Sequence, residues 1–254
     1  EIYVGASTSE NLYKLLKSIL INNSKIKSII SDNLNFPSDI YIAEGISKDF
    51  ENIRFKLLDY GNEAEANIDK LKEFISKNNG ILILSLVSYK SSYRYPIKEI
   101  NDYCENNNSI VIWDISHAIG AIDIDFHNTN TKYAVGCTFK YLNGGPGSQA
   151  FIYVNEKEQN ILKTPIRGWF SHNSPFDFSN NGKKIRDVSK ADTKFTFHIL
   201  FHWLVSGIES ETLRPSPTFD ITPSRPSHTF AIFVLIISKS DFGSFTLIQQ
   251  PLIG

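Results

Sequence analysis

The stretch GILILSLVSYKSSYRYPIKEINDYCENNNSIVIWDISHAIG, residues 80–120, decides the fold of this chain. Residues 80–88 form a nearly continuous apolar run, and residues 109–116 form another. Such runs are typical of strands that are buried on both faces of a sheet. Between them, residues 97–106 have the pattern of a short amphipathic helix. A strand, a helix and a second strand in this order predict two parallel strands with the helix packed on one face.

The same alternation extends to both sides of this unit. Further helices are predicted at residues 11–22 (with Ser9 as the cap), 38–50 and 64–77, and further strands at 25–32, 52–60, 121–126, 133–139 and 148–154. We therefore expect an α/β fold with a mostly parallel sheet sandwiched by helices. Ligands of such sheets bind beyond the carboxyl ends of the strands, so the residues that follow each strand are the candidates for function.

Composition and charge exclude several classes of protein. The 254 residues carry a formal net charge of -1, which gives no reason to expect nucleic acid or an anionic membrane as a partner. The sequence contains no apolar run long enough for a transmembrane helix, and its first residues lack the pattern of a signal peptide. The two cysteines, Cys104 and Cys137, lack metal-ligand spacing. These features favour a reduced, cytoplasmic setting and no metal site.

The last part of the chain differs from the rest. No asparagine or tyrosine occurs after residue 181, and residues 214–228 and 230–245 do not continue the alternation of strands and helices. A second domain, a disordered extension and a change of reading frame near residue 190 all fit this shift. We expect a large domain over residues 1–188 and an aberrant or poorly ordered tail over residues 189–254. Because the chain has no methionine, we expect its large domain to be incomplete at the N-terminus.

Two residues that follow predicted strands suggest a cofactor. Asp114 ends one buried strand, His117 follows three residues later, and Lys140 follows another strand. Each alone is explained by a capping aspartate, a loop histidine or a surface lysine. Together, an acid and a lysine suit pyridoxal phosphate: the lysine forms a Schiff base, and the acid keeps the pyridine nitrogen protonated. Thr8 and Ser9 begin a predicted helix, where an N-cap or a phosphate site is equally expected.

Four motifs strengthen this interpretation. They are NFPSD (35–39), WDISHAIG (113–120), TFKYLNGGPG (138–147) and IRGWFSH (166–172). With these motifs in this order, residues 1 to about 185 resemble kynureninase, a fold type I pyridoxal-phosphate enzyme. The segment around Lys140 is the most specific of the four.

The resemblance implies a role for each matching residue. Lys140 would be the Schiff-base lysine, Asp114 would pair with the pyridine nitrogen, and both would be catalytic. The other cofactor-binding residues would be His117 beside the cofactor, Phe36 stacked on its ring, Asp39 near its polar edge, Thr8, Ser9 and Ser85 at the phosphate, Phe139 next to the lysine, and Trp169 reaching a neighbouring subunit's site. Asn143 and the glycines of 144–147 would shape the turn after the lysine.

The resemblance also implies an activity. Kynureninases hydrolyse the small molecule L-kynurenine, or 3-hydroxykynurenine, to anthranilate, or 3-hydroxyanthranilate, and L-alanine in tryptophan catabolism. They act in the cytoplasm as homodimers with shared sites. Two departures leave alternatives open. Phe139 replaces the usual tyrosine, and residues 189–203 lack the family's Pro-Pro turn and its substrate-carboxylate arginine. An inactive truncated or frameshifted fragment, or another class V aminotransferase-like enzyme such as a cysteine desulfurase, therefore stays an alternative.

Overall fold

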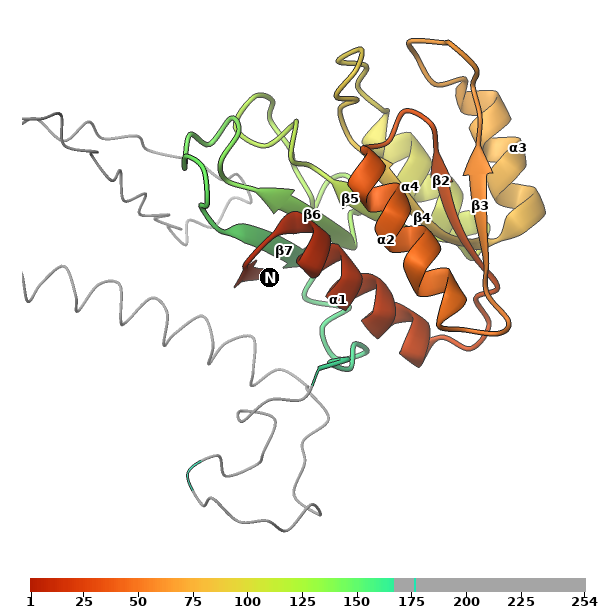
Figure 1. Ribbon diagram of the computed structural model, residues 1–254. Helices are drawn as coiled ribbons and strands as arrows, with labels where there is room; N and C mark the ends of the chain where they lie inside the picture. Colours follow the sequence, from red (N-terminus) through yellow and green to blue (C-terminus); the bar gives the residue numbers. More distant parts are fainter. Residues whose placement is uncertain (167–175, 177–254) are drawn as a thin grey trace, which may run out of the picture.

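The structure, a computed structural model, describes residues 1–166 and residue 176 (Figure 1). Its elements in chain order are β1 (Ile2–Gly5), α1 (Thr8–Asn22), β2 (Ser28–Asp32), α2 (Pro37–Lys48), β3 (Arg54–Leu58), α3 (Ile68–Asn78), β4 (Gly80–Ser85), α4 (Ile97–Asn106), β5 (Ile110–Asp114), β6 (Tyr133–Cys137) and β7 (Ala150–Val154). Within this part of the chain, no helix combines the length and the apolar character needed to span a bilayer.

All seven strands form one sheet in the order β1-β7-β6-β5-β4-β2-β3. Strands β2 to β6 are parallel, and β7 runs antiparallel to both of its neighbours, so β1 points the same way as the parallel strands. We call the edge where these six strands end the carboxyl edge (Gly5, Asp32, Leu58, Ser85, Asp114, Cys137) and the edge where β2, β4, β5 and β6 begin the amino edge (Ser28, Gly80, Ile110, Tyr133). The predicted mostly parallel α/β sheet is confirmed.

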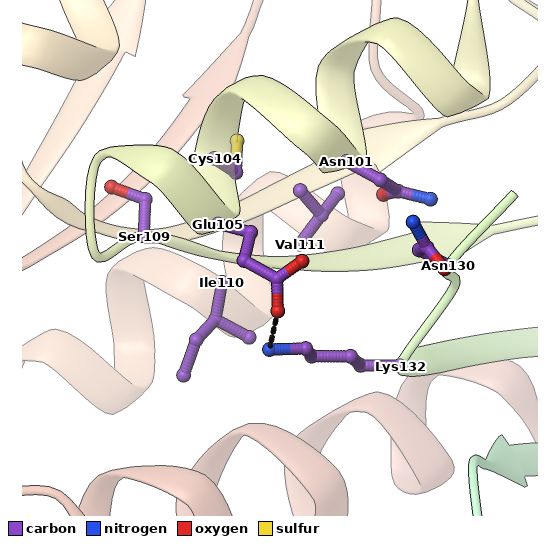
Figure 2. A pocket seen from close by; sticks show the side chains of 8 residues that line it. All are labelled: Asn101, Cys104, Glu105, Ser109, Ile110, Val111, Asn130 and Lys132. Atoms are coloured by element: carbon purple, nitrogen blue, oxygen red, sulfur yellow. Dashed lines mark ion pairs between the residues drawn. The ribbon is translucent and has the colours of Figure 1, made fainter.

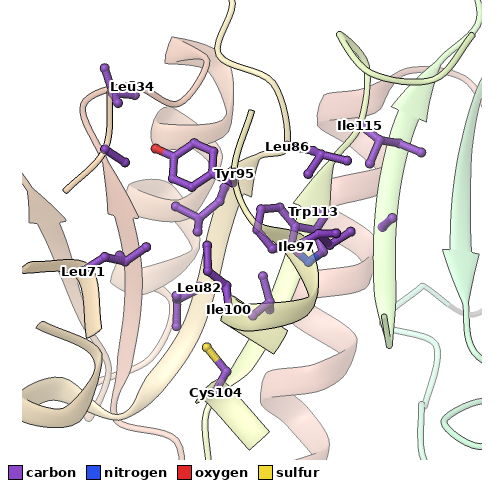
Figure 3. Close-up of a cluster of buried hydrophobic side chains, with 14 of the residues drawn as sticks. Leu34, Leu71, Leu82, Leu86, Tyr95, Ile97, Ile100, Cys104, Trp113 and Ile115 are labelled. Carbon is purple, nitrogen blue, oxygen red and sulfur yellow. The ribbon is translucent and has the colours of Figure 1, made fainter. Parts of the chain in front are cut away.

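Two hydrophobic layers cover the two faces of the sheet. Helices α1 and α2 pack on one face and α3 and α4 on the other (Figure 1). Strand β5 shows the alternation: Val111 and Trp113 belong to the layer beneath α3 and α4, whereas Ile112 belongs to the layer beneath α1 and α2. Figure 3 shows the first of these layers, in which Trp113 lies near Ile97 and Ile100 of α4. Burial on both faces explains why β4 and β5 are apolar throughout.

The structure corrects the prediction at four places. One is the start of α3, which lies at Ile68 after the cap Asn67 rather than at residue 64. Residues 121–126 do not form a strand: Ile122 and Ile124 pack against the core, but the segment pairs with no strand and leads into a turn at Asp125. Strand β1 escaped prediction because it has only four residues. Helix α1 begins at Thr8 rather than at residue 11, since its cap is Ser7, whose hydroxyl accepts a hydrogen bond from the N–H of Glu10, and not Ser9. The tail predicted at 189–254 lies outside the described residues.

Candidate active site at the carboxyl edge of the sheet

Neighbouring parallel strands deliver most of the predicted site residues to the same edge. Phe36 and Asp39 follow β2, Ser85 ends β4, Asp114 ends β5, and Lys140 lies three residues beyond β6. The register places Ser85 directly beside Asp114 across the β4–β5 pair. Residues separated by up to about a hundred positions in the sequence therefore meet because their strands end together.

Lys140 lies among aromatic rings. Its Nζ is 5.1 Å from the centre of the Phe36 ring and 5.4 Å from that of Phe139, within the range of cation–π contacts. The Phe36 ring also meets Tyr89 edge to face at 5.1 Å and lies 5.9 Å from the imidazole of His117. The Lys140 side chain therefore packs against aromatic rings and is only partly exposed to solvent.

The turn after Lys140 is fixed by backbone hydrogen bonds and by glycine. The N–H of Asn143 donates to Lys140 O at 3.1 Å, and the N–H of Gly144 donates to Thr138 O at 2.8 Å. Gly145 and Gly147 have φ values of +77° and +83°, which side chains other than glycine rarely adopt. These bonds and glycines give the segment that carries Lys140 one defined path back to β7.

Two buried carboxyl groups lie next to each other in this site. Asp39 and Asp114 are 1% and 3% exposed. Burial, followed by the charge and hydrogen bond of Asp114, raises the pKa of Asp39 well above its ordinary value, and only the charge of Lys140 and a bond from Ser38 oppose this. Asp114 in turn accepts a hydrogen bond from the N–H of Ser116 at 2.8 Å. The neutral form of the Asp39 carboxyl group is therefore favoured relative to that of an exposed aspartate.

Three buried polar atoms of the site have no partner within the described part of the chain: Asp39 Oδ2, Ser116 Oγ and His117 Nδ1. Buried polar atoms are nearly always hydrogen-bonded, and unpaired ones call for a ligand or water. Burial lowers the pKa of His117, helped by the charge of Lys140 and opposed by Asp114, so its imidazole is neutral at physiological pH. Unpaired acceptors and donors beside a lysine and an aromatic ring fit a planar, polar group such as pyridoxal phosphate.

The other four predicted residues are Ser85, Thr8, Ser9 and Trp169. Ser85 is buried, and its hydroxyl donates to Asn35 Oδ1 at 2.6 Å, so its proton is not free for a phosphate. Thr8 and Ser9 open α1 beside the end of β1, and their backbone N–H groups face out of the first helical turn at this edge. Trp169 lies outside the described residues.

Sequence reasoning missed Asn35, Tyr89 and Ser116 as members of the site. Asn35 and Ser116 sit inside the NFPSD and WDISHAIG motifs, so position within a motif was the available signal. Tyr89 carried no such signal, because its contact with Phe36 depends on which loops meet above the sheet.

A cavity at the amino edge is a poor alternative site (Figure 2). It is lined by residues of α4, β5 and the segment before β6, with Lys132 Nζ 3.1 Å from Glu105 Oε1. Its volume of about 10 Å³ is room for roughly one water molecule. The carboxyl edge is therefore the better candidate.

A comparison with known protein families shows the class to which this chain belongs. The profile of the family described as Aminotransferase class-V matches residues 1–165, and the chain belongs to this family. Two cysteine desulfurases share its fold: the Thermococcus onnurineus NA1 apo structure (TM-score 0.62, 14% identity, 76% of this chain and 46% of that one) and an Escherichia coli structure (TM-score 0.63, 12% identity, 75% and 46%). The fold is that of fold type I enzymes, as predicted.

Within the family, the chain is similar to kynureninases. It is 34% identical to kynureninase from Pseudomonas fluorescens over 181 residues and 31% identical to kynureninase from Burkholderia pseudomallei over 180 residues. Each match covers 69% of this chain and 42% of the relative, so the chain spans less than half the length of the curated relatives it matches. The resemblance drawn from the four motifs is confirmed.

Proposed function

We propose that this chain is the cofactor-binding part of a kynureninase, which hydrolyses L-kynurenine or 3-hydroxykynurenine to anthranilate or 3-hydroxyanthranilate and L-alanine with pyridoxal phosphate. The observation that carries the proposal is the cluster at the carboxyl edge. Lys140 lies against Phe36 and within electrostatic reach of His117 and Asp39, beside the buried Asp114. The identity of up to 34% with kynureninases supports this choice within the family.

Each residue has a task that follows from its place. Lys140 would bond the cofactor covalently and, once released by the substrate amine, would move the proton at the substrate Cα. Asp114 would face the pyridine nitrogen, Asp39 would lie near the polar edge of the ring, and Phe36 would cover one face of it. The N–H groups of α1 at Thr8 and Ser9 would hold the phosphate. Bound pyridoxal phosphate supplies an electron-accepting ring that stabilises negative charge at the substrate Cα.

The remaining expectations are part of the same proposal. They are a cytoplasmic homodimer with shared sites, Trp169 reaching the neighbouring subunit, and a small-molecule substrate rather than nucleic acid or membrane. Phe139 lacks the hydroxyl expected at its position, which removes one hydrogen bond to the phosphate. Such a bond to a charged group contributes about 1.5–3 kcal/mol, so we expect weaker cofactor binding than in a tyrosine-bearing relative.

The first test concerns the cofactor. Purified chain mixed with pyridoxal phosphate should gain the absorption band of the lysine-bound cofactor, and borohydride reduction should fix the cofactor on the peptide that contains Lys140. The variant Lys140→Ala should lose both signals. Lys132→Ala, at the amino edge, is the matched control and should keep them. Labelling that persists in Lys140→Ala would overturn the assignment.

The second test concerns the substrate. Release of fluorescent anthranilate from L-kynurenine by the cofactor-loaded chain separates a kynureninase from the alternatives. Conversion of cysteine to alanine, with sulfide released once a thiol reductant is added and with no anthranilate, would favour a cysteine desulfurase. Cofactor binding without either product would favour an inactive fragment.

A further inference from the structure

One buried amide connects the site to the sheet beneath it. Asn35 is 2% exposed and uses its side chain in four hydrogen bonds. Its Nδ2 donates to Ser31 Oγ and to Ile83 O, each at 3.0 Å, and its Oδ1 accepts from Ser85 Oγ at 2.6 Å and from the N–H of Phe36 at 2.8 Å. The amide cannot be turned over, because its NH₂ group would then face the N–H of Phe36.

These bonds join three elements at the point where the site begins. Ser31 belongs to β2, Ile83 and Ser85 belong to β4, and Phe36 caps α2. Phe36 O accepts the N–H of Asp39 at 3.0 Å, so the orientation of Phe36 also sets the first turn that carries Asp39. A single side chain thereby fixes the backbone from which the Phe36 ring extends towards Lys140 and the first turn that carries Asp39.

The loop after β4 also forms hydrogen bonds with the segment that leads into α2. Ser88 Oγ donates to Leu34 O at 3.3 Å, and Lys90 Nζ donates to Asn33 O at 3.4 Å. Between them, the Tyr89 ring packs against Phe36. The segment that leads into α2 is thus bonded to β2 and β4 through Asn35 and to the loop after β4 through Ser88 and Lys90.

We propose that Asn35 is a positioning residue that sets Phe36 and Asp39 against the cofactor ring. Ser85 acts through the same amide, since its proton is donated to Asn35. The inference rests on the proposed function for the identity of the cofactor. Its geometric part, the fixing of Phe36, stands on the hydrogen bonds alone.

The test compares Asn35→Leu with Asn101→Leu. Asn101 is similarly buried, at 7% exposure, and also anchors a network: it donates to Thr129 O and Thr131 Oγ1 and accepts from Trp113 Nε1. It lies on α4, away from the carboxyl edge. Both variants should unfold at lower denaturant concentration than the wild-type chain, so general damage is matched.

Two measurements separate positioning from stability. In Asn35→Leu, amide hydrogen exchange of Phe36 should rise about tenfold or more, and the dissociation constant of pyridoxal phosphate should rise about tenfold. Asn101→Leu should change neither. Exchange at Phe36 that is equal in the two variants would overturn the proposal. So would unchanged cofactor affinity in Asn35→Leu.

A milder variant guards against misfolding and tests Ser85. Ser85→Ala leaves Asn35 in place and should raise exchange at Phe36 and weaken cofactor binding, both less than Asn35→Leu does. Weaker binding with unchanged exchange would mean that Ser85 contacts the cofactor directly and would overturn its role through Asn35. Absence of Lys140-dependent binding in the wild-type chain would instead overturn the proposed function, and the exchange of Phe36 would still show whether Asn35 fixes the segment.

Discussion

The two edges of the sheet treat their polar groups differently. At the amino edge, the buried Ser28 hydroxyl donates to Asn78 O and Asn79 O, and Asn101 on α4 donates to Thr131 Oγ1 just before β6. At the carboxyl edge, by contrast, several buried polar atoms lack partners among the described residues, although Asn35, Ser85 and Asp32 are hydrogen-bonded. The buried atoms without a partner among the described residues belong to Asn11, Asp39, Tyr60, Ser116 and His117, which follow the carboxyl ends of β1, β2, β3 and β5.

This difference indicates that the amino edge contributes to stability and that the carboxyl edge is suited to bind a ligand. A hydrogen bond made inside the protein contributes modestly, whereas an unpaired buried group costs about 1–3 kcal/mol. In the part of the chain that the structure describes, no buried side-chain atom at the amino edge carries that cost. The carboxyl edge carries it at several places, together with the buried acids Asp32, Asp39 and Asp114. Such a concentration of unfavourable groups is typical of functional sites.

The largest effect on stability should come from a buried core side chain whose polar group is hydrogen-bonded. Trp113 is fully buried, and its indole N–H donates to Asn101 Oδ1 at 2.8 Å. Trp113→Ala should lower the free energy of unfolding by about 3–5 kcal/mol, because it leaves a large cavity. Phe36→Ala, at the half-buried ring of the site, should cost much less stability but abolish cofactor binding. Urea unfolding and cofactor titration measure the two losses, and equal stability losses would break the comparison.

A second prediction uses the buried acid at the end of β2. Burial raises the pKa of Asp32 to about 6, although Tyr95 OH donates to its Oδ2 at 2.7 Å. The folded state therefore holds this proton more tightly than the unfolded state, whose value is near 3.9. The stabilisation is complete below about pH 4 and is lost as the pH rises through 6, a loss of up to about 3 kcal/mol.

Asp32→Asn should remove that part of the pH dependence. Unfolding free energies at pH 4.5 and pH 7.5 should therefore lie closer together in the variant than in the wild-type chain. Asp69→Asn, at an exposed position of α3, is the control and should leave the difference as it is. Asp39, whose pKa is also raised, should leave a smaller difference in the variant. A difference as large in Asp32→Asn as in the wild-type chain would contradict the assignment of this proton.

The sequence predicts the buried strands and their ends better than the side-chain contacts made beyond them. Strands β4 and β5 are recognisable because burial on both faces demands apolar residues throughout, and the positions of Asp114 and Lys140 follow from where strands end. The regular alternation of residues 121–126 was misleading, since pattern alone does not show whether a partner strand exists. The hydroxyl direction of Ser85 and the packing of Tyr89 depend on strand order, which no local pattern contains.

A third prediction compares two acids. Asp114→Asn keeps the acceptor for the N–H of Ser116 but removes the charge that would face the pyridine nitrogen. Cofactor affinity should fall about 10- to 150-fold, as for the loss of a hydrogen bond to a charged group. Asp102→Asn breaks a surface pair with Lys98 next to the amino-edge cavity and should leave affinity unchanged. Titration of the cofactor absorption band measures both, and equal affinities in the two variants would remove the distinction between the edges.

The smallest predicted effect is a change in unfolding free energy, and its sign should be opposite at the two edges. Ser28 and Ser116 are 4% and 2% exposed, but of these two hydroxyls only that of Ser28 has partners among residues 1–166 and 176. Ser28→Ala should therefore destabilise the cofactor-free chain by about 1 kcal/mol, whereas Ser116→Ala should stabilise it by up to about 1 kcal/mol, since it removes an unpaired buried group. Saturating pyridoxal phosphate should shrink the gain from Ser116→Ala, because a bound ligand can supply the missing partner. Destabilisation of the cofactor-free chain by both variants would show that the Ser116 hydroxyl is satisfied without a ligand.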